Sequence, residues 1–369
     1  MRKKVLLELC MSPDLGGLEL YMVRAAKALK DDFDVLSIIN EDTKLEQYYD
    51  KNEKYIKIKK TSNLFMMSAA KKLAKIIDEE GVDLIHLHWT KDIPFVVLAK
   101  IFSKKKPKLA QTRNMTMTRF KNDFYHRLMY KNIDMMLPVT YQVKEQLEKF
   151  IPVDIRPNIE VLYMGSDKVE MLDLDGLNSF KKEISFKEKS LNIGMVGRIN
   201  EAKGQHLLIE ALSNIEDDNV EAYFVGHEMK EGYINELKAL AKRLGLADRV
   251  HFLGFMKNPH HFFQACDVIV LASKRETFGL VIIEAMQVET AVIGSNSGGV
   301  VEIIDDEVTG ILFEVGDSGS LASKIEKLYT DRVLLDKISQ MGREKAQEKF
   351  SNEKQFEKLA TILKDLSES

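Results

Sequence analysis

The sequence contains little of what disulfide-rich, membrane-spanning or fibrous proteins need. Among its 369 residues there are two cysteines, seven prolines and one tryptophan. Cys10 and Cys266 are far apart in the chain and each borders an apolar segment, which predicts two buried thiols rather than a disulfide or a metal-binding pair. No apolar run reaches the roughly eighteen residues of a membrane span, and the apolar segment within Met1–Met11 is too short for a signal peptide. We therefore expect a soluble, cytoplasmic protein.

Length and composition indicate a globular protein of two domains. The 369 residues are 45% hydrophobic and 30% charged, so either half of the chain can bury a core of its own. The formal net charge is −3, but residues 1–168 carry 30 Lys and Arg against 23 Asp and Glu, and the remainder carries 24 against 34. The first half is therefore basic and the second half acidic. No nucleic-acid-binding motif is present, so we expect no nucleic-acid partner.

The positive charge of the first half gathers in three segments. They are Lys54–Lys60, Ser103–Lys108 and Arg119–Lys131, and aromatic residues lie among the cations of the last one. Such segments suit contact with an anionic lipid surface, and they are equally compatible with an ordinary solvated face. Peripheral contact with an anionic membrane is therefore a hypothesis of the sequence.

Both halves alternate short apolar strands with amphipathic helices, which predicts an α/β fold built on parallel sheets. The strands expected in the first half are Val5–Cys10, Asp34–Asn40, Asp83–His88, Pro107–Gln111 and Asp134–Val139. Those expected in the second half are Leu191–Val196, Glu221–Val225, Val250–Leu253, Cys266–Ala272, Ala291–Gly294 and Gly310–Phe313. Polar residues 167–189 are expected to form a linker, and Met229–Leu244 a long helix.

One strand–loop–helix unit of the second half carries two carboxylates. An apolar strand is followed by the loop Ser273–Phe278 and by a helix expected to begin at Leu280. Ligands of open parallel sheets bind beyond the carboxyl ends of the strands, and a helix that opens after a glycine offers free N–H groups to an anion. Gly279 and Leu280 therefore suit phosphate oxygens. With Glu276 before them and Glu284 one turn deeper, the unit suits a nucleoside diphosphate sugar; two solvated glutamates are the plain alternative.

A second loop, Gly197–Gly204, follows the strand Leu191–Val196 and contains two cations. Arg198 and Lys203 flank its turn, where together they could clasp a diphosphate. The spacing differs from a Walker A loop, in which the lysine is followed by Ser or Thr. Solvated surface cations are the alternative interpretation of this loop.

Together these motifs resemble the signature of retaining glycosyltransferases with the GT-B fold, of the group 1 or family 4 type. The resemblance is carried by the two glutamates with seven residues between them, the adjoining Phe278 and Gly279, the sequence EAM, and GGVVE at Gly298–Glu302. It implies two Rossmann-like domains facing a central cleft, with a C-terminal helix that crosses back to the N-terminal domain. It places the domains at residues 1–168 with 351–369, and at residues 169–350.

The resemblance also assigns roles on the donor side. Glu276 would contact the transferred sugar, and Glu284 the ribose of the nucleotide. Arg198 and Lys203 would bind the diphosphate and offset the charge that gathers on it as it leaves. The other donor contacts that the resemblance implies are Gly197, Phe278, Gly279, Leu280 and, around the base, Gly254, Phe255 and Met256.

Acceptor-side residues are expected in the first half. His86 and His88 share one face of a strand, and His88 at its carboxyl end is the better candidate for lining the cleft. Many members of the resembled family carry a histidine after the next strand, where this chain has Arg113 and Asn114, and we expect one of these two to replace it. The acceptor or cleft candidates are Gly16, Gly17, His88, Arg113 and Asn114, with Glu19 close behind the two glycines.

The function implied by the resemblance is transfer of a sugar, with retention, from a nucleoside diphosphate sugar to a hydroxyl of a sugar, glycolipid or other acceptor. Synthesis of polysaccharide, lipopolysaccharide or glycolipid is the expected setting, in the cytoplasm or at the inner face of the membrane. No cofactor or metal is expected, because two cations and a helix N-terminus can neutralise the diphosphate. A nucleotide-sugar epimerase of the same fold and an inactive nucleotide-sugar-binding protein are the alternatives.

Overall fold

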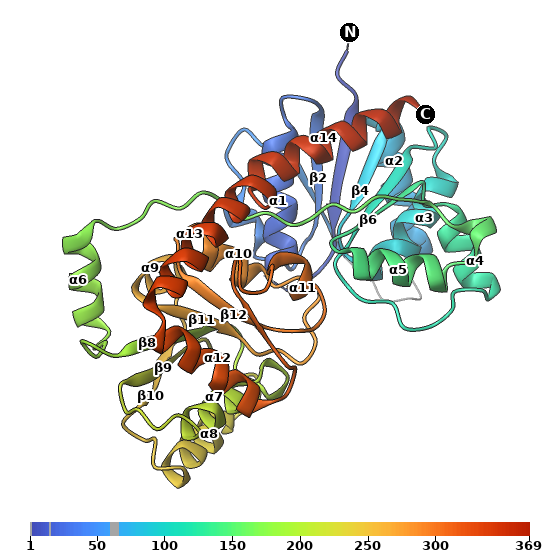
Figure 1. Ribbon diagram of the computed structural model, residues 1–369. Helices are drawn as coiled ribbons and strands as arrows, with labels where there is room; N and C mark the ends of the chain where they lie inside the picture. The colour runs from blue at the N-terminus through green and yellow to red at the C-terminus, as the bar shows by residue number, and fades with distance from the viewer. Residues whose placement is uncertain (1, 15, 60–65) are drawn as a thin grey trace. The chain divides into compact units, whose positions relative to one another are not determined.

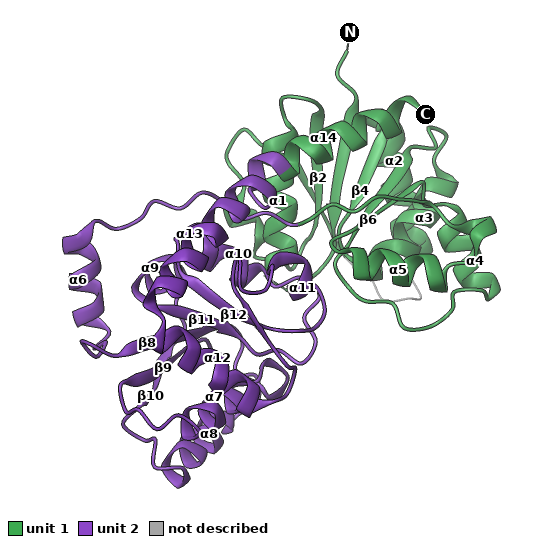
Figure 2. Cartoon of the chain, in the orientation of Figure 1, with its two compact units in different colours: residues 1–163, 355–369 green, residues 164–354 purple. Residues whose placement is uncertain are grey.

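The chain folds into two compact units (Figures 1 and 2). The structure is a computed structural model that describes residues 2–14, 16–59 and 66–369. Unit 1 comprises Met1–Tyr163 and Gln355–Ser369, and unit 2 comprises Met164–Lys354. These divisions fall a few residues from the positions 168 and 351 expected from the sequence. Lys60, the last residue of the basic segment Lys54–Lys60, lies outside the described residues.

Unit 1 contains a seven-stranded parallel sheet with strand order β3-β2-β1-β4-β5-β6-β7. Its strands are β1 (Val5–Cys10), β2 (Asp34–Asn40), β3 (Tyr55–Ile58), β4 (Leu84–Leu87), β5 (Lys108–Arg113), β6 (Met135–Pro138) and β7 (Asn158–Ile159). Its helices are α1 (Gly17–Leu29), α2 (Met66–Glu79), α3 (Ile93–Phe102), α4 (Phe124–Lys131), α5 (Tyr141–Phe150) and, from Gln355 onward, α14 (Asn352–Glu368).

The two faces of this sheet are covered by different helices. Leu7 and Leu9 of β1 belong to the core formed with α2 and α3, whereas Cys10 packs with Met22 and Val23 of α1. This alternation follows from the two-residue period of a strand. Beside α1 lies α14, where the ring centroids of Tyr21 and Phe356 are 5.5 Å apart. The C-terminal helix is therefore part of the core of unit 1.

Unit 2 contains a six-stranded parallel sheet with strand order β10-β9-β8-β11-β12-β13. Its strands are β8 (Leu191–Val196), β9 (Val220–Val225), β10 (Val250–Gly254), β11 (Val268–Leu271), β12 (Ala291–Ser295) and β13 (Ile311–Phe313). Its helices are α6 (Leu174–Glu183), α7 (Gln205–Ser213), α8 (Tyr233–Arg243), α9 (His260–Ala265), α10 (Leu280–Gln287), α11 (Val300–Ile303), α12 (Ser318–Thr330) and α13 (Arg332–Lys349).

The strand order of both sheets reverses once, which is the Rossmann-like arrangement expected from the sequence. In each unit the first three strands are added one after another toward one edge of the sheet. The chain then returns to the middle, and the remaining strands are added toward the other edge. The expected α/β fold of two parallel-sheet domains is therefore confirmed. No helix of the described residues is both long and apolar enough to cross a membrane.

Two expectations for unit 2 were wrong. Residues 167–189 are not a plain linker, because α6 forms within them and contacts α9, where the ring centroids of Phe180 and His261 are 6.1 Å apart. Just before α6, Leu172 exchanges two hydrogen bonds with the side chain of Gln264 in α9. None of the residues of α6 is buried, so its polar composition resembles that of a loop. The helix predicted from Met229 begins instead at Tyr233, since Gly232 precedes it in the left-handed conformation, with a φ of +88°.

Candidate functional site

The candidate site of unit 2 lies where the strand order reverses, between β8 and β11. The connections that leave these two neighbouring strands run to opposite sides, and the carboxyl ends of such strands are where open parallel sheets bind ligands. The loop Gly197–Gly204 follows β8, and Ala272–Gly279 follows β11. The sequence motifs with the strongest functional signal are therefore brought together at one edge of one sheet.

The loop after β8 is held in place by backbone contacts. Gly204 has a φ of +79°, and a Cβ at this residue would lie 2.3 Å from the carbonyl oxygen of Ala272, so only glycine fits. The Asn200 side chain accepts a hydrogen bond from the Lys203 amide at 3.2 Å. The Gln205 side chain donates to the Arg198 carbonyl at 3.1 Å. The backbone that carries the two predicted cations is thus fixed at three points.

An ion pair joins the two motifs. The Nζ of Lys203 lies 2.7 Å from Oε2 of Glu276, with side-chain exposures of 27% and 19%. The backbone adds a second link, because the Lys274 amide donates to the Ala202 carbonyl at 3.1 Å. A partly exposed pair of this kind contributes about 1 kcal/mol or less to stability. Its importance is positional, since it brings together a predicted phosphate ligand and a predicted sugar ligand.

The glycines of GGVVE hold Glu276 from the neighbouring strand. Gly298, with a φ of +65°, approaches so closely that a Cβ would lie 1.9 Å from the carbonyl oxygen of Glu276. The Gly299 amide donates to that same oxygen at 3.0 Å. Ser295, at the end of β12, donates through Oγ to the Ser273 carbonyl at 2.9 Å. In the sequence this motif is only a family marker, and its support of the glutamate loop becomes visible in the structure.

The N-terminus of α10 follows the glutamate loop. Gly279 precedes the helix with a φ of +104° and provides no side-chain cap, so the first amide groups of α10 are available to an anion. Glu284 is half-buried on this helix. The Phe278 ring is 4% exposed and lies 6.1 Å from the Phe350 ring, measured between centroids. The structure therefore places Phe278 in the core of unit 2, whereas Glu284 is only partly covered.

The remaining donor-side candidates lie in loops at the same edge of the sheet. Arg198 is exposed, and its guanidinium forms no ion pair with any described residue. Phe255, after β10, is 68% exposed, and its ring lies 5.9 Å from that of His227 in an edge-on arrangement. Gly254 has a φ of +78°, while Met256 is half-buried. Their predicted role around the base stays a prediction.

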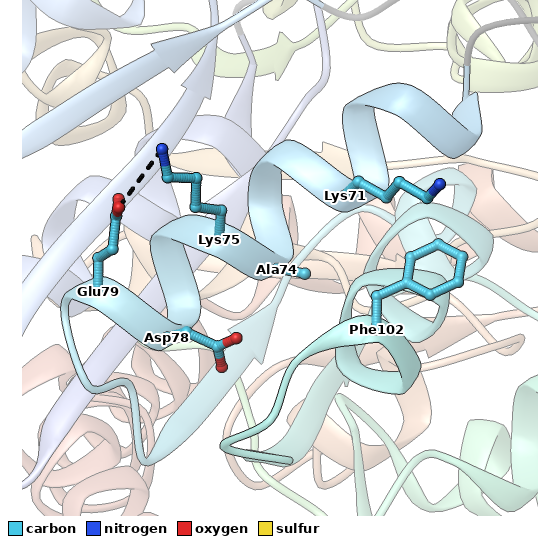
Figure 3. A pocket seen from close by; sticks show the side chains of 6 residues that line it. All are labelled: Lys71, Ala74, Lys75, Asp78, Glu79 and Phe102. Atoms are coloured by element: carbon cyan, nitrogen blue, oxygen red, sulfur yellow. Dashed lines mark ion pairs between the residues drawn. The ribbon is translucent and has the colours of Figure 1, made fainter.

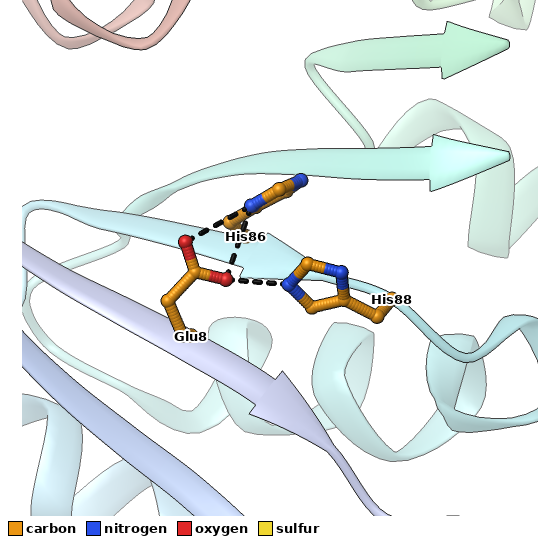
Figure 4. A group of neighbouring side chains, drawn as sticks. All are labelled: Glu8, His86 and His88. Atoms are coloured by element: carbon orange, nitrogen blue, oxygen red, sulfur yellow. Dashed lines mark hydrogen bonds and ion pairs between the residues drawn. The ribbon is translucent and has the colours of Figure 1, made fainter. Parts of the chain in front are cut away.

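In unit 1 the strand order reverses between β1 and β4, and a buried polar cluster lies there (Figure 4). Glu8 of β1 is paired in register with His86 of β4, and His88 follows on the same face. The Glu8 carboxylate contacts His86 Nδ1 at 3.1 Å and His88 Nε2 at 2.5 Å. A second nitrogen of His86, Nε2, lies 2.8 Å from Thr112 Oγ1. Sequence reasoning singled out His88 but missed Glu8.

The protonation of this cluster follows from its burial and its contacts. Burial alone would raise the pKa of Glu8, but the adjacent His86 and His88 outweigh it and lower the pKa to about 2. Because a carboxylate only accepts hydrogen bonds, each imidazole nitrogen facing it carries a proton. Burial and the nearby His86 lower the pKa of His88 to about 4. His88 Nδ1 is then a buried lone pair, without a hydrogen-bond donor among the described residues.

Two other acceptor-side candidates differ in their availability. Arg113 is 5% exposed and donates to Met115 O at 2.7 Å, to Thr90 Oγ1 at 3.2 Å and to Thr116 O at 3.1 Å. Its guanidinium therefore braces the loop that follows β5. Asn114 is half-buried and remains the more accessible of the two.

The glycine-rich candidate loop of unit 1 precedes α1. Gly16 is the N-cap residue of α1, and Gly17 is its first residue. A Cβ on Gly16 would lie 3.3 Å from Oε2 of Glu19, which is buried. Gly16 and Gly17 thus remain candidates by position, at the carboxyl edge of the sheet.

A surface pocket of unit 1 lies elsewhere. It is lined by Lys71, Ala74, Lys75, Asp78, Glu79 and Phe102, from α2 and α3 (Figure 3). Asp78 accepts hydrogen bonds from Ser103 Oγ at 2.6 Å and from the Lys105 amide at 3.0 Å, so it caps the end of α3. Since α2 runs back toward the amino ends of the strands, this pocket is not at the edge where parallel sheets bind ligands.

Comparison with known proteins gives two family matches. Residues 178–345 match the model of glycosyl transferases group 1, and residues 8–142 match that of glycosyl transferase 4-like proteins. The chain is 27% identical over 311 residues to N-acetyl-alpha-D-glucosaminyl L-malate synthase of Bacillus anthracis, covering 81% of this chain and 79% of that protein. Both predicted donor loops lie within the first match, and the Glu8 cluster lies within the second.

Two further similarities extend over most of the chain. A Campylobacter jejuni protein, N-acetylgalactosamine-N,N'-diacetylbacillosaminyl-diphospho-undecaprenol 4-alpha-N-acetylgalactosaminyltransferase, is 27% identical over 289 residues, or 75% of this chain and 74% of that protein. The crystal structure of Anabaena HepE in complex with UDP and glucose has a TM-score of 0.84 at 22% identity, over 99% of this chain and 100% of that one. The structural likeness establishes the same two-domain fold.

The support of Glu276 by Gly298 can be tested directly. We expect Gly298→Ala to displace the Glu276 loop, because the new Cβ would meet the Glu276 carbonyl oxygen and the φ of +65° is strained for alanine. Loss of the bond to Glu276 O should speed hydrogen exchange of the Gly299 amide by roughly tenfold. Gly316→Ala is the control, since Gly316 has a φ of +79° but no atom near its Cβ position. Equal protection of the Gly299 amide in both variants would contradict the proposed support.

Proposed function

Because the chain belongs to the group 1 glycosyltransferases, we propose that it transfers a sugar from a nucleoside diphosphate sugar to an acceptor hydroxyl, with retention of anomeric configuration. The observation that carries the proposal is the Lys203–Glu276 ion pair at the strand-order reversal of unit 2. A diphosphate on Lys203 would lie directly beside a sugar on Glu276. No observation favours the epimerase or the inactive binding protein.

Unit 2 supplies the groups that the donor needs. Arg198 and Lys203 provide two positive charges for the diphosphate, and the uncapped amide groups of α10 provide a third, partial one. Anabaena HepE, which has the same fold, was crystallised with UDP and glucose, which supports a nucleotide sugar as the donor here. Glu284 on α10 would then bind the ribose, and Gly254, Phe255 and Met256 would lie near the base.

The proposed chemistry needs no nucleophile from the protein. The bond between the anomeric carbon and the diphosphate oxygen breaks, and the acceptor oxygen bonds to the anomeric carbon on the same face. The acceptor hydroxyl gives its proton to the departing diphosphate, which acts as the base. Arg198 and Lys203 stabilise the charge that develops on that diphosphate, which is the term by which such sites lower the barrier most. The same two cations make a metal ion unnecessary for transfer.

We assign the acceptor to unit 1 and to the synthesis of a cell-envelope saccharide. The Campylobacter jejuni relative acts, by its name, on a saccharide carried by diphospho-undecaprenol. A lipid-linked acceptor of that kind would be presented at the inner face of the membrane. Gly16, Gly17 and the half-buried Asn114 are the positions in unit 1 where it would bind.

The surface of unit 1 supports contact with an anionic membrane. Phe120, Phe124 and Tyr125, within the basic segment Arg119–Lys131, are 64%, 84% and 49% exposed. Exposed aromatic side chains next to cations suit the interface between lipid headgroups and acyl chains. Two further apolar side chains of this region, Met115 and Leu128, are also exposed.

The role of the cations predicts a loss of turnover rather than of folding. We expect Arg198→Ala and Lys203→Ala each to lower kcat by about 10²- to 10³-fold, since each removes a charge that acts mainly on the leaving diphosphate. Thermal unfolding should change little, because Arg198 is exposed and the Lys203 pair is weak. Arg243→Ala, an exposed cation of α8, is the control. Unchanged kinetics in both variants would refute the phosphate role.

The two glutamates should be separable. We expect Glu276→Ala mainly to lower kcat, because Glu276 holds the transferred sugar, and Glu284→Ala mainly to raise the Kd for the nucleotide. Steady-state kinetics and calorimetric titration with the nucleoside diphosphate would measure these effects, with the exposed Glu326→Ala as the control. Identical kinetic profiles of Glu276→Ala and Glu284→Ala would contradict the assignment of separate roles.

The stereochemistry and the metal requirement can be measured in the same assay. The anomeric configuration of the product is determined by NMR after transfer in excess chelator. We expect retention and undiminished transfer. Inversion or a strict metal requirement would contradict the mechanism, and an isomerised donor formed without acceptor would identify an epimerase.

Membrane contact predicts a surface-specific effect. We expect the protein to float with vesicles that contain anionic lipid and to be released by salt, since each cation near such a surface adds roughly 1 kcal/mol. Phe120→Ser with Phe124→Ser should abolish flotation by removing the aromatic side chains that insert. Val333→Ser, in unit 2 and 80% exposed in the wild type, is the matched control. Flotation that is independent of anionic lipid, or unchanged in the double variant, would favour a soluble acceptor.

A further inference from the structure

Three side chains of metal-ligand type converge inside unit 1. They are Glu8, His86 and His88, all fully buried, and one ligand atom from each lies within 4.8 Å of the others. Figure 4 shows both imidazole rings turned toward the Glu8 carboxylate. Within residues 2–14, 16–59 and 66–369, this is the one group of three or more His, Cys, Asp or Glu side chains whose ligand atoms meet so closely.

The positions of the three ligands are fixed by the sheet. Parallel pairing of β1 and β4 sets Glu8 opposite His86, and His88 follows two residues later on the same face. The two imidazole rings are 4.3 Å apart between centroids, with an angle of 56° between their planes. Thr112, on the next strand, contacts the remaining nitrogen of His86 at 2.8 Å. Metal-bound histidines commonly have such a hydrogen bond on their other nitrogen, because it fixes the orientation of the ring.

The other fully buried glutamate cluster of the described residues is built differently. In unit 2, Glu221 pairs with Lys187 at 2.7 Å and with a single imidazole, His251, at 2.9 Å. A lysine is the ordinary counter-charge for a buried carboxylate, and it is a poor metal ligand when protonated. Glu8 has two imidazoles in place of a lysine. Two imidazole nitrogens and one carboxylate oxygen are a donor set that binds Zn²⁺.

We propose that Glu8, His86 and His88 bind a divalent transition-metal ion, with Zn²⁺ as the expected occupant. Zinc forms bonds of about 2.0–2.2 Å to such ligands, so tetrahedral ligand atoms lie roughly 3.3 Å apart. The Glu8 oxygen is now 3.1 Å from His86 and 2.5 Å from His88, and no two of the three ligand atoms are more than 4.8 Å apart, so binding requires the distances between them to change by about 1.5 Å or less. The ion displaces the two ring protons that face Glu8, and each imidazole takes up a proton from solvent on its other nitrogen, so both rings stay neutral and no net proton is released. His86 Nε2 then carries a proton and donates it to Thr112 Oγ1.

The ion would stabilise the fold of unit 1 and would take no part in sugar transfer. It would cross-link β1 to β4 where the strand order reverses, beneath α1. The groups that we assign to the donor lie in unit 2, and the acceptor positions Gly16, Gly17 and Asn114 are not among the three ligands, so the metal site does not rest on the proposed function. A metal bound to the folded state alone also raises the thermal midpoint, by mass action.

The test is the metal content and the spectrum of the full chain. We expect about one equivalent of Zn²⁺ per chain after expression with added zinc and gel filtration, measured by plasma mass spectrometry. Co²⁺ added to protein stripped at mildly acidic pH should give visible absorption bands, which report imidazole and carboxylate ligands. Glu8→Gln and His86→Gln should lose both signals, whereas His251→Gln should keep them.

A second variant covers the case in which the ligand variants fail to fold. Thr112→Val keeps the shape of the side chain and removes the hydrogen bond to His86, so we expect Zn²⁺ to bind about 10- to 100-fold more weakly. A folded wild type that takes up neither Zn²⁺ nor Co²⁺ would overturn the proposal, since hydrogen bonds alone would then join the three side chains. Metal retained in His86→Gln, lost in His251→Gln, or bound equally well by Thr112→Val would also overturn it.

Discussion

The site of unit 2 depends on the peptide group and side chain of one residue, Glu276. Its carbonyl oxygen accepts the Gly299 amide, and Gly298 must lack a Cβ to pass it. Its carboxylate pairs with Lys203 at 2.7 Å. Loops from β8, β11 and β12 therefore meet at this residue, and each is anchored on a rigid strand. Charges held in this way need little rearrangement during a reaction, which is the condition under which fixed charges are most effective in catalysis.

Much of this arrangement was predictable, because local patterns determine it. The strands of both sheets are short apolar runs, and their alternation with amphipathic helices specifies parallel sheets. Gly204 and Gly279 are the N-cap residues of helices that follow strands β8 and β11. A glycine between an apolar strand and an amphipathic helix can be recognised in the sequence alone. Helix α6 was missed for the opposite reason. None of its residues is buried, so it lacks the apolar stripe by which a helix is recognised.

Contacts between distant segments could not be derived from the sequence. Glu8 lies in an otherwise apolar strand, where a charged residue is rare, so its position could have marked it as a candidate. Its partners His86 and His88, however, are 78 and 80 residues away in the sequence. Only the strand order puts β1 beside β4. Arg113 illustrates the same limit. Its position at a strand end suggested a ligand contact, but its guanidinium donates to carbonyl groups of its own loop, a geometry that residue type does not reveal.

The division of unit 1 between both ends of the chain affects the order of folding during synthesis. Leu359 and Leu363 of α14 are fully buried in unit 1, and the side chain of Lys358 donates to the Val161 carbonyl at 2.7 Å. These residues leave the ribosome only after all of unit 2. Part of the core of unit 1 therefore stays uncovered until α14 has been synthesised, whereas unit 2 is one continuous segment and can fold before that. Apolar surface that stays uncovered in this way makes a nascent chain prone to aggregation, so the risk falls on unit 1, although its amino-terminal strands are the first to be made.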